Sequence, residues 1–78
     1  MERYFIDVFN GHTKHQDTIG SELASAIDAK NEAVAALIDL MHRQVQHHDT
    51  SILRTSIRNK DDAVIYEGGL SFTGLLYD

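Results

Sequence analysis

Histidine is the residue type in this chain that could most directly carry chemistry, because imidazole binds metal ions and transfers protons near neutral pH. The chain has five histidines, with His12 and His15 spaced as H-x2-H and His47 and His48 adjacent. A closed zinc site needs four converging ligands. Two residues spaced i and i+3 on a strand-like stretch point to opposite faces, and the flanking residues include no cysteine. The sequence therefore predicts no metal site.

Nucleophilic and acid–base catalysis have equally little support. No serine lies in a G-x-S-x-G motif, and no P-loop, dinucleotide fingerprint or EF-hand loop is present. The adjacent Asp61 and Asp62 fall in a charged N-K-D-D stretch that is typical of an exposed turn, whereas acid–base catalysis needs a pocket that shifts pKa values. Asp7 remains as a single carboxylate inside a strand-like stretch. We therefore expect a non-enzymatic protein without catalytic residues or cofactors.

Composition limits the remaining function classes. The 78 residues fit one domain, residues 1–78, and a domain of this size has a thin core. The lack of cysteine excludes disulfides and thiolate zinc sites, which leaves oligomerisation as a common way to supplement so small a core. A net charge of −5 argues against nucleic acid as the partner.

Hydropathy gives no sign of a membrane segment. The longest apolar run, AVAALI at residues 33–38, is far shorter than the roughly 20 residues that a membrane span needs. The opening MERYFIDV lacks the cationic start and long apolar core of a signal peptide. We therefore expect a cytoplasmic protein that does not bind membranes.

Four strand-like segments and one helical segment organise the chain. The strands are expected at residues 3–9, 12–17, 52–58 and 63 to about 76. The first ends at Asn10-Gly11, which is a strong hairpin signal. The last is interrupted by Gly68-Gly69 and is expected to bend there, with two short strands as the alternative.

Residues 25 to about 47 show a helical period, with Ser25 as the expected N-cap. Apolar residues cover about half of the helix circumference, more than the roughly 100° stripe that a surface helix usually buries. The expected buried face holds Ala26, Ala29, Ala33, Ala36, Leu37, Leu40 and Met41. The order β-β-α-β-β predicts an α+β fold, a four-stranded antiparallel sheet with one long helix packed on one face.

Three stretches of this sequence resemble a family of small bacterial proteins with a domain of unknown function. Members of this family begin with RYxFDxxDG and continue with a DxxGxEL turn, an alanine-rich helix and a VRDxxG-like turn. The matching positions are Arg3, Tyr4, Asp7 and Gly11 in the first motif and Asp17, Gly20, Glu22 and Leu23 in the second. IRNKDD at residues 57–62 is similar to the last turn. The resemblance implies a small bacterial domain and brings no assigned activity.

The sheet face opposite the helix is the candidate interaction surface. Strand alternation places Tyr4, Ile6 and Val8 against the helix. The uncovered face then holds Arg3, Phe5, Asp7, Phe9, Arg54 and Arg58. We expect Asp7 to be exposed in this contact face, where it can pair with Arg54 or Arg58.

Aromatic residues beside arginine are typical of protein–protein contacts, which favours an unknown protein partner or a homodimer. Two alternatives stay open. One is a weak single-stranded nucleic-acid-binding module, in which bases stack on the phenylalanines. The other is a monomer whose residues 75–77 fold back over this face.

Overall fold

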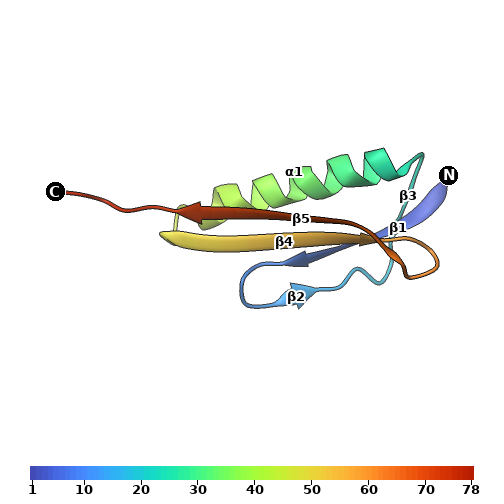
Figure 1. The fold of residues 1–78 in the computed structure, drawn as a ribbon, viewed down its shortest axis with the longest axis horizontal. Helices are drawn as coiled ribbons and strands as arrows, with labels where there is room; N and C mark the ends of the chain where they lie inside the picture. The colour runs from blue at the N-terminus through green and yellow to red at the C-terminus, as the bar shows by residue number, and fades with distance from the viewer.

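In the computed structural model, which describes residues 1–78, one helix covers one face of an antiparallel sheet (Figure 1). The elements are β1 (Glu2–Phe9), β2 (Lys14–His15), β3 (Ser21–Leu23), α1 (Ala26–Gln44), β4 (Thr50–Arg58) and β5 (Val64–Thr73). The strand order is β2-β1-β4-β5, and β3 pairs with the first residues of β1. The predicted α+β class is confirmed, with β3 as a fifth strand that the pattern did not predict.

The core is a thin layer of side chains between α1 and the sheet. It consists of two clusters, one of Tyr4, Ala29, Ala33 and Ile57 and the other of Leu37, Met41 and Leu53. Leu53 and Ile57, both from the central strand β4, are fully buried. The alternation predicted for β1 and β4 is therefore confirmed, since Tyr4 and Ile57 pack against helix residues.

The helix begins as predicted, because the Ser25 hydroxyl accepts a hydrogen bond from the Asp28 N–H at 3.3 Å. Its buried residues form an i, i+4 stripe of Ala29, Ala33, Leu37 and Met41. Ala26 and Ala36 lie outside the stripe and are exposed, so the expected buried face is wider than the observed one. The helix is not apolar enough over its length to cross a membrane.

Strand β5 is a single strand, as predicted, but its irregularity lies elsewhere. Ile57 pairs with Tyr66 and Arg58 pairs with Val64, so Ile65 is the extra residue of a β-bulge. Gly68 and Gly69 pair in regular register with β4. The prediction of a bend at these glycines is therefore wrong. A glycine can take part in regular antiparallel pairing, so its presence alone does not produce a bulge.

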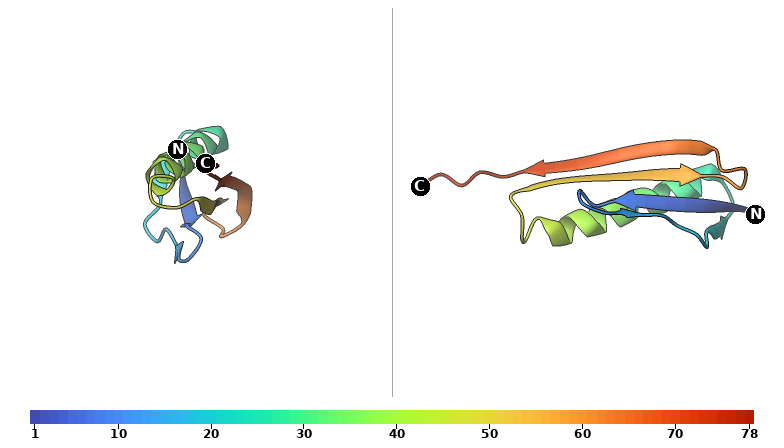
Figure 2. Two further views of the ribbon diagram at one scale, coloured as in Figure 1. Left: turned by 90° about the vertical axis from the view of Figure 1, so that its left-hand side faces the viewer. Right: turned by 90° about the horizontal axis from the view of Figure 1, so that it is seen from below.

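The C-terminal residues extend past the end of the sheet (Figures 1 and 2). The molecule measures 53 × 20 × 16 Å along its principal axes. Leu75, Leu76 and Tyr77 are 74%, 91% and 82% exposed. The alternative in which this segment folds back over the open sheet face is therefore wrong for this chain.

Candidate functional site

A cluster of charged side chains lies on β1 and β4, on the sheet face opposite α1. Arg58 donates from Nε to Asp7 Oδ2 at 2.7 Å and from Nη2 to Asp7 Oδ1 at 3.0 Å. Its Nη1 donates to Asp62 Oδ1 at 2.8 Å, and its guanidinium carbon lies 5.1 Å from the centre of the Phe5 ring. The bidentate geometry is the strongest form of an arginine–carboxylate pair. Of the two arginines expected to be able to pair with Asp7, Arg58 is the one that does.

Asp17 connects this cluster to the outer edge of β1. Its N–H donates to Asp7 Oδ1 at 2.9 Å, and its carbonyl oxygen accepts from Arg58 Nη2 at 2.8 Å. The Asp17 carboxylate accepts hydrogen bonds from the N–H groups of Ile6, Ile19 and Gly20 at 2.9–3.1 Å. Along β1, Ile6 lies between the residues that pair with β3 and those that pair with β2. The carboxylate therefore replaces a strand partner at this position.

Gly20 allows the loop to lie directly against β1. It has φ +77°, and a Cβ atom here would lie 2.9 Å from Arg3 Cγ and 2.9 Å from Phe5 Cε1. A residue with a side chain would be strained by both the backbone and the contact. Residues 17–20 therefore lie against the start of β1, on the sheet face that was expected to be uncovered.

The pKa values show that the cluster holds its carboxylates ionised. Burial raises the pKa of Asp7, but hydrogen bonds from Arg58 and the Asp17 N–H outweigh this effect and leave it below its ordinary value. Burial also raises the pKa of Asp17, and the N–H groups of Gly20, Ile6 and Ile19 outweigh it in the same way. The hydrogen bonds to Asp7 and then to Asp62 raise the pKa of Arg58. None of these groups is poised to exchange a proton near neutral pH.

The six residues predicted for the interaction face therefore have different surroundings. Asp7 is only 3% exposed, so its expected exposure is wrong, because Arg58 and the Asp17 loop cover it. Arg3 is held on the loop by Ile19 O at 2.8 Å and Glu22 at 3.4 Å. Phe5 lies under Arg58 and Gly20.

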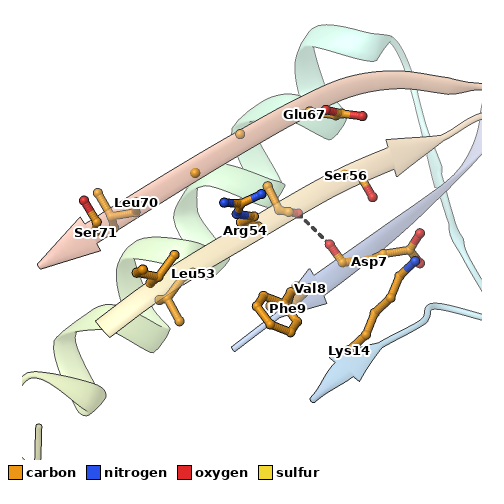
Figure 3. A pocket seen from close by; sticks show the side chains of 14 residues that line it. Asp7, Val8, Phe9, Lys14, Leu53, Arg54, Ser56, Glu67, Leu70 and Ser71 are labelled. Carbon is orange, nitrogen blue, oxygen red and sulfur yellow. Dashed lines mark hydrogen bonds between the residues drawn. The ribbon is translucent and has the colours of Figure 1, made fainter. Parts of the chain in front are cut away.

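Phe9 and Arg54, together with the buried Asp7, line open space. They border a shallow hollow of about 560 Å³ that lies across β1, β4 and β5. Its other side-chain contributors include Lys14, Ile52, Glu67 and Ser71. Figure 3 shows Arg54 projecting from β4 on the side of β5, where Gly68 and Gly69 carry no side chains.

A family model for a domain of unknown function, DUF6894, matches residues 3–71. The chain belongs to the DUF6894 family. The predicted membership of a family with a domain of unknown function is thereby confirmed. The search of the curated proteins and the search of the solved structures found no match.

Within this DUF6894 domain, the sequence indicates the turn that Asp17 closes but not the contacts of Asp17 with Ile6 and Asp7 on β1. The signal is visible in D-T-I-G, since aspartate followed three residues later by a glycine is typical of a turn closed by the aspartate side chain. No three histidine, aspartate or glutamate side chains gather closely enough to hold a metal ion. His12 and His15 are exposed around β2, and His47 and His48 are exposed after α1.

Proposed function

We propose that this DUF6894 protein is a non-enzymatic, cytoplasmic binding module that acts through protein–protein contact, with a second copy of itself as the first partner. The observation that supports this proposal is that several large apolar side chains at one end of the molecule are exposed to solvent. The group consists of Ile52, Phe72, Leu75, Leu76 and Tyr77, all of which are exposed. Exposed apolar side chains gathered at one end of a molecule are candidates for an interaction site.

The charged cluster supports a structural role rather than catalysis. Every buried polar side-chain atom of the protein has a hydrogen-bond partner, and the carboxylates of Asp7 and Asp17 are saturated by backbone and arginine donors. A catalytic carboxylate needs an unsatisfied atom within reach of a substrate. The hollow beside Arg54 is open and shallow, which suits contact with another macromolecule.

Single-stranded nucleic acid is less well supported as the partner. Of the three arginines expected on this face, Arg58 is neutralised by Asp7 and Asp62, and Arg3 pairs with Glu22. Arg54 has no ion pair, but one arginine and a net charge of −5 give little attraction for phosphates. Phe5 is also covered by Arg58 and so cannot stack on a base.

Light scattering coupled to size exclusion, from low to high micromolar protein, tests this proposal. We expect the mass to rise with concentration toward twice the chain mass of 8.8 kDa. A constant mass of 8.8 kDa over the whole range would contradict self-association. Binding of a short labelled oligonucleotide at low salt, where phosphate contacts are strongest, would instead favour the nucleic-acid alternative.

A further inference from the structure

We propose that the second copy binds along the free edge of β5. In this arrangement, β5 and residues 74–78 of two copies form one antiparallel, two-fold symmetric ladder. This proposal rests on the self-association proposed above and names the surface that performs it. We call residues 66–78 the β5 edge.

The two edges of the sheet differ in whether their backbone groups have hydrogen-bond partners. On the β1 side, β2 pairs with Val8 and Phe9, and the Asp17 carboxylate satisfies the N–H of Ile6. On the β5 side no strand, helix or side chain pairs with the backbone. Proteins usually protect such an edge with proline, lysine or a bulge. The chain has no proline, β5 has no lysine, and its bulge at Ile65 leaves residues 66–73 regular.

The hydrogen-bonding alternation identifies which backbone groups are free. The Gly74 N–H donates to Asp49 O at 2.7 Å, so Gly74 and every second residue before it bond toward β4. The N–H and C=O groups that point away from the sheet belong to Glu67, Gly69, Ser71 and Thr73. Three of these four residues have small side chains, which lets another strand approach. Unpaired groups of this kind are the donors and acceptors of strand addition.

The position of Glu67 restricts the register between two copies. Like charges directly opposite each other destabilise a strand pair, so a ladder centred at Glu67 is disfavoured. A two-fold axis at Phe72 sets that ring against its own copy, and aromatic cross-strand pairs are favourable. The same register sets Leu75 opposite Gly69 and Tyr77 opposite Glu67, so the exposed C-terminal residues gain a strand to pack on.

The exposed apolar side chains supply about half of the area that such an interface needs. Phe72, Leu75, Leu76 and Tyr77 expose roughly 350–400 Å² per copy, from their exposed fractions and typical side-chain areas. A stable interface buries about 800 Å² per partner. The backbone of the strand edge, from residue 66 to 78, adds to this area.

Single introduced cysteines test the edge and its register, because the chain has no cysteine of its own. We would compare Phe72→Cys with Ser71→Cys under mild oxidation, with Asn31→Cys on the exposed side of α1 as the control. At the two-fold axis two Cα atoms lie about 4.5–5.5 Å apart, within the range that a disulfide requires. We expect Phe72→Cys to form covalent dimers at least tenfold faster than either other variant.

Ser71→Pro provides an independent measurement. It removes an N–H that points away from the sheet, so the monomer keeps its β4–β5 hydrogen bonds. We expect an unchanged circular dichroism spectrum and at least tenfold weaker association. Faster crosslinking at Ser71 than at Phe72 would overturn the register.

A dimer that survives Ser71→Pro and crosslinks no faster at Phe72 than at Asn31 would overturn the β5 edge and leave the proposed function standing. A wild-type protein that stays monomeric at all concentrations would overturn both proposals.

Discussion

Replacing Asp7 with asparagine should cost a large share of the stability of this protein. The Asp7 side chain is 4% exposed and that of Arg58 is 15% exposed. Removing one partner of a buried ion pair typically costs about 3–5 kcal/mol, because the other charge stays buried without compensation. Asparagine keeps one oxygen for the Asp17 N–H, so we expect a loss of about 3 kcal/mol. A domain of 78 residues has about 4–12 kcal/mol in total.

Urea denaturation followed by circular dichroism at pH 7 measures this loss. The protein concentration is held constant, since self-association raises the apparent stability. Asp62→Asn is the matched control, because Asp62 binds the same Arg58 at 2.8 Å through a side chain that is 78% exposed. Exposed pairs contribute about 0–1 kcal/mol, so we expect the control to lose less than about 1 kcal/mol.

The comparison between these two variants decides whether the charged cluster stabilises the fold. If Asp7→Asn lost no more stability than Asp62→Asn, the reasoning from burial would be refuted. In the double variant Asp7→Asn with Arg58→Met, no buried charge remains without a partner. We expect it to be more stable than Arg58→Met alone.

Three further predictions follow from the same loop and from the helix start. Gly20→Ala should destabilise the protein by about 1–3 kcal/mol and so lower its melting temperature, because Gly20 has a positive φ and an added Cβ would lie 2.9 Å from its neighbours. Gly69→Ala is the control and should change the melting temperature little, because a Cβ there would lie 3.6 Å from the nearest atom. Since the folded pKa values of Asp7 and Asp17 are lowered, their stabilisation is present above about pH 4 and is lost as the pH falls through those values. An acid titration followed by circular dichroism should therefore be shallower for Asp17→Asn than for the wild type. Ser25→Ala should cost about 1 kcal/mol in urea denaturation through loss of the N-cap.

Local patterns predicted the helix, four of the five strands and the faces of β1 and β4. The alternation in β1 placed Tyr4 against the helix and Asp7 on the other side, and the structure confirms both. The N-cap at Ser25 followed from residue type and spacing, and its hydrogen bond is present. These predictions succeeded because each depends on neighbours within a few residues, where sequence and geometry are directly related.

The burial of Asp7 could not be predicted in the same way. It depends on a loop ten residues away, whose Asp17 N–H reaches the carboxylate, and on Arg58 from the far end of the chain. The short strand β3 was missed because its three residues pair with β1 without an alternating pattern of their own. The bulge at Ile65 was placed at the glycines instead, because residue type alone does not fix strand register.

The long separation between Asp7 and Arg58 also has a kinetic consequence. Joining residues 51 positions apart costs roughly 3.5 kcal/mol of chain entropy, whereas closing the short connection between β4 and β5 costs about half as much. We therefore expect the β4–β5 hairpin and α1 to form first and β1 to dock onto them late. An ion pair that forms after the transition state contributes mainly to the unfolding barrier. On this folding order, the charged cluster lowers the unfolding rate and leaves the folding rate nearly unchanged.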